Sequence, residues 1–111
     1  YADNGAKGVY KDVSSDYGTP KFYTITMDKD ISTALDSIII YTNGVVGTNT
    51  QNLNSGTNAN NFGDYVHYIG ERFGDIAEAF ADINEIFVYN TLLSQTDITD
   101  LYNNYITPKY L

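Results

Sequence analysis

The carboxylates of the second half of the chain are the residues whose spacing could support catalysis. Glycosidases hold two carboxylates about 5 to 10 Å apart across the bond that they cleave. Two pairs come near this pattern, Asp75 with Glu78 and Asp82 with Glu85. The members of each pair are three positions apart, and such residues point to opposite faces of an extended strand. Neither pair can flank one sugar bond, so the spacing predicts no glycosidase.

The other candidates for chemistry are better interpreted as structural residues. Glu85 lies between apolar residues of a predicted strand, where we expect it to accept hydrogen bonds from loop amides or from Arg72. A Ser-His-Asp triad would depend on the single histidine, His67, which is more simply an exposed strand residue. The chain has no cysteine, which excludes thiol catalysis, disulfides and cysteine zinc sites. We expect no enzymatic activity.

Calcium is the one cofactor that the sequence leaves open. Asp28, Asp30 and Asp64 lie in predicted turns, where carboxylate oxygens could converge on a hard cation. The chain holds 23 Asp plus Asn residues, so clusters of this kind also arise by chance. Solvated turn residues, with no metal bound, are the simpler interpretation.

A group of aromatic residues could bind a glycan. Tyr65, His67 and Tyr68 follow a polar stretch and could offer flat rings with polar edges to a sugar, with Arg72 as a further ligand candidate. The same aromatics are also what an ordinary strand favours. Sugar binding and plain strand composition are therefore the two interpretations of this group.

Charge and composition limit the partners. The formal charge is −8, which repels nucleic acids and anionic membrane surfaces, and no apolar stretch is long enough to insert into a membrane. Acidic, polar, tyrosine-rich chains are common on extracellular, cell and virion surfaces, where we expect this one. The first residues have no signal-peptide pattern. A start at Tyr1 predicts a processed product or a piece of a longer protein.

Several segments have the composition of β-strands: residues 8–13, 22–27, 37–42, 65–69 and 83–89. The apolar run of 37–42 predicts a central strand. In 83–89 the alternation separates Ile83, Glu85, Phe87 and Tyr89 from Asn84, Ile86 and Val88.

Turns and loops separate these strands. Asn43-Gly44 predicts a type I′ hairpin turn, after which residues 45–48 would return as a short strand. The polar stretch 49–63 predicts a long surface loop, and 71–81 a connection. Within 22–27, we expect Tyr23, Ile25 and Met27 to form the core face, since the alternate positions carry two threonines.

One helix is predicted near the C-terminus. Ser94 can cap its first amides, and Asp97 lies three positions later at the positive end of the helix dipole. The helix then carries one amphipathic stripe, made of Ile98, Leu101, Tyr102 and Tyr105. We expect Pro108 to end it. Tyr102, Tyr105 and Tyr110 would pack this helix or contact a neighbouring subunit.

Five pieces of sequence occur in a characteristic order: FYTITMD at 22–28, YTNG at 41–44, YIGER at 68–72, FADINEIFVYN at 80–90 and LS at 93–94. This order resembles the C-terminal part of the laminin G-like, concanavalin A-like lectin/glucanase family, over residues 22–106. The chain departs from the family pattern in three places. Ala81 replaces a glycine, tryptophan is absent, and the 49–63 loop is long. The Glu-x-Asp-x-x-Glu strand of the family's hydrolases is also absent.

The resemblance implies an all-β fold. It would be an antiparallel β-sandwich of the jelly-roll type with one short helix near the C-terminus, and it is incomplete, because only five or six strands can be counted. Residues 1–111 would form a single domain or the C-terminal part of one. The missing strands would belong to another part of the protein or to another chain.

Three functions follow from these expectations. The first is a non-catalytic surface module for adhesion, glycan binding or assembly, whose partners are glycans or neighbouring protein subunits in a homo-oligomer or larger assembly. The alternative is a purely structural subunit of a phage particle or extracellular filament, whose sandwich a neighbouring chain completes. A glycoside hydrolase piece with its catalytic strands elsewhere is the third.

Overall fold

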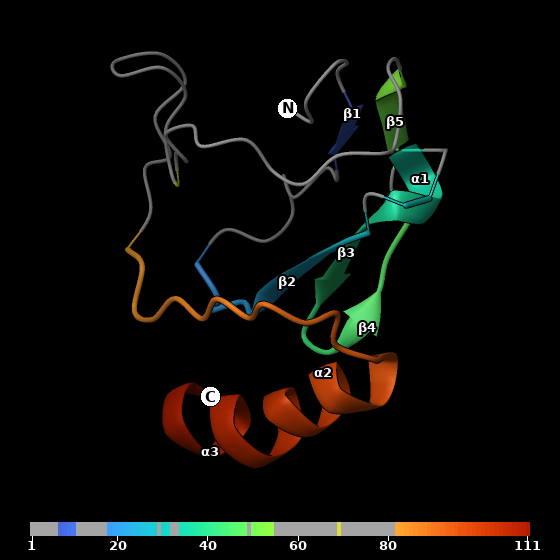
Figure 1. Ribbon diagram of the computed structural model, residues 1–111. Helices are drawn as coiled ribbons and strands as arrows, with labels where there is room; N and C mark the ends of the chain where they lie inside the picture. Colours follow the sequence, from blue (N-terminus) through green and yellow to red (C-terminus); the bar gives the residue numbers. More distant parts are fainter. Residues whose placement is uncertain are drawn as a thin grey trace.

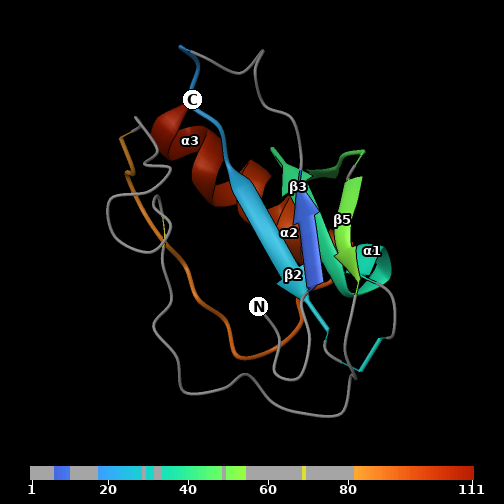
Figure 2. The same ribbon diagram turned by 90° about the horizontal axis from the view of Figure 1, so that it is seen from above.

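A computed structural model describes residues 7–10, 18–28, 30–31, 34–48, 50–54, 69 and 82–111 (Figure 1). Its best-defined features are a three-stranded antiparallel sheet and a C-terminal helix. Both views place the helix on one side of the sheet (Figures 1 and 2). The described ranges do not show a complete β-sandwich.

The sheet follows the sequence closely. Its order is β2 (Tyr23–Met27), β3 (Ile38–Thr42) and β4 (Val45–Val46). The strand predictions for 22–27, 37–42 and 45–48 are confirmed with slightly shorter bounds. The central position of β3 is also confirmed, and every residue of this strand is at least half-buried.

The hairpin turn between β3 and β4 is the one that Asn-Gly predicts. Asn43 has φ +52° and Gly44 has φ +78°, and a type I′ turn needs positive φ at both central residues. The Asn43 side chain also accepts a hydrogen bond from the Phe22 amide at 3.0 Å. The turn therefore joins β3 to β4 and is tied to the start of β2.

The predicted core face of β2 was wrong. Tyr23, Ile25 and Met27 are exposed, whereas Thr26 on the opposite face is buried. Phe22 lies on the same side of the chain as Thr26, because the two are four residues apart in an alternating pattern. The ring of Phe22 stacks on that of Tyr102 in the helix, with centroids 6.4 Å apart. Helix packing therefore selected the threonine face, although the sequence pattern favoured the more apolar one. Among the described residues, the Oγ1 atom of Thr24 is buried there without a hydrogen-bond partner.

A second pair of strands lies outside this sheet. β1 (Lys7–Tyr10) pairs antiparallel with β5 (Thr50–Asn54), with an irregularity between Gly8 and Val9. Figures 1 and 2 place this pair on the side of the sheet opposite the helix. The prediction of a loop throughout 49–63 was therefore wrong for residues 50–54. A polar strand such as TQNLN gives little local signal, and the pairing with β1 defines it.

One short helix belongs to the described part of the N-terminal half. α1 (Ala34–Ser37) leads directly into β3, so Ser37 belongs to this helix and not to the strand that we predicted from 37. The backbone amide of Asp28, directly after β2, donates a hydrogen bond to the carbonyl of Ser37, the last residue of α1, at 2.7 Å. This bond holds the end of β2 next to the end of α1. The predicted turn at 28–30 is confirmed by the hydrogen bond from the Asp30 amide to the Asp28 carboxylate at 2.9 Å.

The C-terminal helix is longer than predicted. It consists of α2 (Gln95–Leu101), a π-helical turn η1 (Tyr102–Ile106) and α3 (Thr107–Tyr110). Ser94 and Asp97 form the predicted cap, because each side chain bonds the other residue's backbone amide. Ile98 is fully buried, as the stripe predicted, and Ile106 is a buried residue that the stripe missed.

Pro108 does not end the helix, contrary to prediction. A proline inside an α-helix removes one hydrogen bond and clashes with a carbonyl of the preceding turn. Here the π turn precedes it, with the Thr107 amide bonding the Tyr102 carbonyl five residues back, and Pro108 lies in the first turn of α3. The wider π turn changes the hydrogen-bond pattern just before the proline. Pro108 then occupies the first turn of α3, where a residue needs no amide proton to bond within the helix.

The predicted strand 83–89 is not a strand in the structure. Residues 82–89 run as a chain without regular secondary structure, and none of them belongs to a ladder. Strand composition alone cannot make a strand, because the backbone groups of a strand need a partner to pair with. The predicted strand 65–69 and the connection 71–81 lie outside the described residues, apart from Ile69.

Candidate functional site

The alternation of residues 82–89 positions two side chains against the helix. The ring of Phe87 lies edge-on to Tyr105, with centroids 5.7 Å apart. Glu85, two residues earlier in the same phase, reaches the same tyrosine. Glu85 and Phe87 thus lie on one side of the chain, as the alternation predicted, even though no strand forms.

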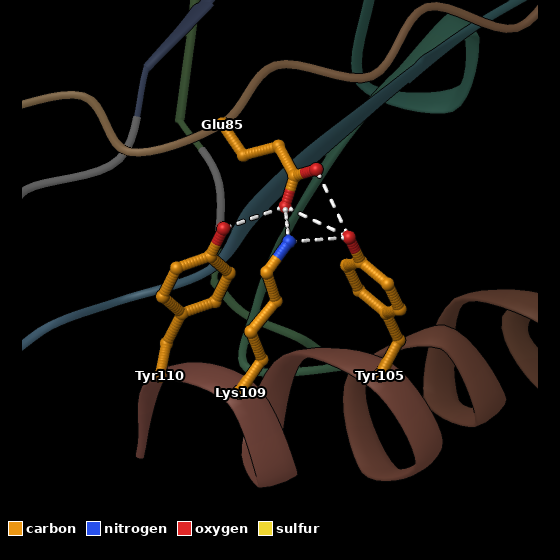
Figure 3. A network of polar contacts seen from close by, with 4 residues as sticks. All are labelled: Glu85, Tyr105, Lys109 and Tyr110. Atoms are coloured by element: carbon orange, nitrogen blue, oxygen red, sulfur yellow. Dashed lines mark hydrogen bonds and ion pairs between the residues drawn. The ribbon is translucent and has the colours of Figure 1, made fainter.

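Glu85 is the centre of a polar cluster with Tyr105, Lys109 and Tyr110 (Figure 3). The Tyr105 hydroxyl is 3.0 and 3.2 Å from the two carboxylate oxygens, and the Tyr110 hydroxyl donates to Oε2 at 2.7 Å. The Lys109 ammonium donates to Oε2 at 3.1 Å and to the Tyr105 hydroxyl at 2.6 Å. One carboxylate therefore receives three donors from the last two turns of the helix.

Helix geometry brings these donors together. Tyr105 and Lys109 are four residues apart, so they are neighbours on the helix surface. Tyr105 belongs to the π turn, Lys109 and Tyr110 to α3. The Lys109 ammonium also lies 4.7 Å from the centre of the Tyr105 ring and 5.1 Å from that of Tyr110. Cation–π attraction therefore supports the same arrangement.

The cluster shifts the pKa values of its members. Hydrogen bonds from Tyr110 and then Lys109 hold the pKa of the Glu85 carboxyl below its ordinary value. The pKa of the Lys109 ammonium is raised, first by its hydrogen bond with Tyr105. The pKa of the Tyr110 hydroxyl is raised by its hydrogen bond to the Glu85 carboxylate. Glu85 is thus ionised and Lys109 charged throughout the neutral range.

These protonation states favour a clamp over a catalytic group. A general acid must carry a proton near neutral pH, and Glu85 does not. The oxygens of this carboxylate already accept from three side chains, which would compete with its action as a general base or nucleophile. What the arrangement can do is tie the segment 82–89 to the C-terminal end of the helix.

The other end of the helix is docked on the hairpin turn. The side-chain amide of Gln95 donates a hydrogen bond from Nε2 to the Gly44 carbonyl at 2.6 Å, and the Thr99 hydroxyl lies 3.1 Å from the same oxygen. A methyl group built on Gly44 would lie 3.1 Å from Cβ of Tyr102 and 3.4 Å from the Thr99 Cα. The glycine therefore serves two purposes, the positive φ of the turn and the close approach of the helix.

Most of the predicted ligand residues cannot be placed. Tyr65, His67, Tyr68, Arg72 and Asp64 lie outside the described residues, so glycan binding remains a prediction.

The two calcium candidates that the structure describes share a turn, in which the Asp28 carboxylate accepts the Asp30 amide. Within the described ranges no group of three or more His, Asp or Glu side chains could hold a metal ion.

Sequence reasoning found the acceptor of the cluster but not its donors. Glu85 was expected to accept hydrogen bonds from loop amides or Arg72, and its partners in the structure are Tyr105, Lys109 and Tyr110. For the tyrosines the sequence predicts helix packing or a contact with a neighbouring subunit, and it does not single out Lys109. The signal was the i, i+4 spacing of Tyr105 and Lys109 at the end of a predicted helix.

A scan against protein-family models, a search of curated proteins and a search of solved structures each found no match. The resemblance to concanavalin A-like sandwiches therefore remains a prediction. In the part of the chain that the structure describes, no helix has both the length and the apolar character needed to cross a bilayer.

Proposed function

We propose that this chain is a non-catalytic structural module that assembles with neighbouring protein subunits. The observation that carries the proposal is the sheet face formed by Tyr23, Ile25 and Met27 of β2 and Val45 of β4. Ile25 is 56% exposed and Val45 is 65% exposed. The opposite face of the sheet packs on the helix, and neighbouring apolar side chains that stay exposed commonly mark a protein contact.

The register of the sheet places these side chains on one face. Tyr23 opposes Thr42, which in turn opposes Val45, and Ile25 opposes Ile40. Directly opposed residues point to the same side of an antiparallel sheet. The face therefore presents a row of β-branched and aromatic side chains, which is the kind of surface that a second sheet covers in a β-sandwich.

The proposed architecture is accordingly an antiparallel sandwich of the concanavalin A-like type, completed by strands from a neighbouring subunit. An extracellular or virion exterior is the setting that the acidic, polar composition favours. The clamp on Glu85 supports the non-catalytic part of the proposal, because this carboxylate is ionised and already accepts from three side chains. A glycan-binding module is the other function that the sequence pattern allows. No described residue bears on glycan binding.

The test is the solution mass of the 111-residue chain, measured by light scattering over a range of concentrations, with circular dichroism to follow folding. We expect a mass above 12.4 kDa that rises with concentration. Ile25→Lys should reduce this association, because it places a charge on the exposed face. Thr96→Lys, at an exposed position of α2, is the matched control and should associate normally. A folded monomer at every concentration would overturn the proposal.

A further inference from the structure

The segment around Phe87 has the composition of a strand but no partner strand among the described residues. None of residues 82–89 belongs to a ladder, and no backbone hydrogen bond joins them to another described residue. On the side away from Glu85 and Phe87, Ile86 is 53% exposed and Val88 is 89% exposed. Unpaired, β-prone backbone of this kind is a template for pairing with another strand.

The segment is also held ready for such pairing. The Glu85 cluster and the Phe87–Tyr105 contact attach one of its faces to the helix. The backbone is therefore fixed in an extended form before any partner arrives. Preorganisation of this kind lowers the entropy cost of binding.

We infer that residues 83–91 pair antiparallel with the same residues of a second copy of this chain, about a two-fold axis at Phe87. The inference rests on the proposed assembly role and adds to it a second contact, separate from the exposed face of β2 and β4, together with its partner and register. A contact between two identical surfaces must be self-complementary. The sequence of this segment meets that requirement.

Symmetry restricts the register. Opposed residues of an antiparallel pair point to the same face, and a two-fold axis perpendicular to the pair keeps each residue on the same face in both copies. Each residue can therefore oppose only residues of its own face, so the axis must pass through a residue position. Glu85, Ile86 and Phe87 are the candidate positions near the middle of the segment.

The chemistry of the opposed pairs selects among them. An axis at Glu85 would oppose two carboxylates, which is destabilising. An axis at Ile86 would oppose Val88 to the amide of Asn84 in the partner subunit. An axis at Phe87 opposes Ile86 to Val88 of the partner subunit twice, and so gathers the exposed apolar residues into one patch.

The same register suits the helix-facing side. Glu85 then opposes Tyr89 of the partner subunit, so no carboxylate faces another one. Each copy carries a net charge of −8, and repulsion between copies opposes association. The only charged residue of 83–91 is Glu85, and Lys109 pairs with it. This segment therefore repels a second copy less than an acidic surface without such a pair would. Because salt screens the remaining repulsion, association should increase with ionic strength.

The absence of cysteine makes the register directly testable. Opposed positions of an antiparallel pair have Cα atoms about 4.5 to 5.5 Å apart, which a disulfide can span. The diagonal positions are about 7 to 8 Å apart, which is too far. In the full chain we would prepare Ile86→Cys and Val88→Cys separately, then oxidise each alone and an equimolar mixture of the two with diamide.

We expect at least five times more cross-linked dimer in the mixture than in either variant alone, because only the mixture opposes position 86 to position 88. Asn103→Cys, at an exposed helix position, measures cross-linking by random collision. Circular dichroism of each variant, together with its concentration-dependent mass, shows that folding and association are retained.

The other outcomes separate this inference from the proposed function. Strong cross-linking of Ile86→Cys alone would place the axis at Ile86 and overturn the register. Chains that associate but cross-link no better than Asn103→Cys would overturn the pairing and leave the assembly role standing on another surface or with another strand. A monomeric chain would overturn both.

Discussion

The two ends of the C-terminal helix are held by opposite kinds of contact. At its N-terminal end, the side chains of Gln95 and Thr99 reach the Gly44 carbonyl, and the backbone approaches so closely that a methyl group on Gly44 would crowd Tyr102. At its C-terminal end, exposed side chains of Tyr105, Lys109 and Tyr110 converge on Glu85. The first contact is short-ranged and partly buried, whereas the second is charged and open to water.

The difference indicates that the two contacts have separate roles, one in stability and one in local structure. Buried packing contributes most to stability, since exposed ion pairs are screened by water and salt. The N-terminal contact should therefore determine whether helix and sheet stay together. The Glu85 cluster should determine where the segment 82–89 lies, with little effect on global unfolding. Five predictions test this division, from the largest expected effect to the smallest.

Ile98→Ala should cause the largest loss of stability. Ile98 is fully buried, and truncating such a side chain typically costs about 2 to 4 kcal/mol. The measurement is the free energy of unfolding from urea titration. Leu92→Ala, at an exposed position, is the control and should change it by less than about 0.5 kcal/mol. Equal losses in both variants would contradict the buried docking of the helix.

Gly44→Ala should come next, with Gly18→Ala as its matched control. The two glycines have nearly the same positive φ, +78° and +80°, so both alanines bear a backbone cost of about 1 to 2 kcal/mol. Only Gly44 lies against the helix, whereas nothing lies within 4 Å of a methyl group at Gly18. Gly44→Ala should therefore lose about 1 kcal/mol more than the control. A difference of zero between the two unfolding free energies would mean that the close approach is unimportant.

Ser94→Ala should have an intermediate effect. The substitution removes the side-chain acceptor for the Asp97 amide, and loss of a cap of this kind costs about 1 kcal/mol. Thermal unfolding followed by circular dichroism measures it. Ser94→Thr retains a hydroxyl and should recover most of the loss. If it recovers nothing, the capping hydrogen bond is not the cause.

Glu85→Gln should change global stability least and local structure most. Removing the charge weakens the bonds from Lys109 and the two tyrosines, so the backbone of 84–89 should become more mobile, as lower NMR order parameters would show, while the unfolding midpoint stays nearly constant. The pKa of Tyr110, which the Glu85 carboxylate raises, should fall towards its ordinary value, as NMR titration of the ring would show. Asp100→Asn removes an exposed charge outside the cluster and should change neither quantity.

Acid should reproduce the effect of this variant in the wild-type chain. The folded pKa of Glu85 lies below the ordinary value of 4.5, so its contribution is fully present above pH 4.5. It is lost as the pH falls through the lower folded value. The NMR order parameters of 84–89 should fall in that acid range and not between pH 7 and pH 5. A fall above pH 5 would assign the effect to another group.

The features that could be predicted are those that neighbouring residues decide. The Asn43-Gly44 turn follows from two residues that tolerate positive φ, and the cap from a serine and an aspartate three positions apart. The β3 strand follows from a run of β-branched residues. In each case the competing conformations are excluded within a few residues, so no distant contact is needed.

The features that could not be predicted depend on distant partners. The threonine face of β2 is covered because Phe22 meets Tyr102, which is 80 residues away in the sequence. The helix continues through Pro108 because a π turn precedes it. Residues 82–89 have the composition of a strand but no described strand to pair with, so Glu85 and Phe87 contact the helix instead. Local chemistry determined the turn, the cap and the strands of the hairpin, whereas tertiary packing alone decided which faces are covered and which carboxylate the helix binds.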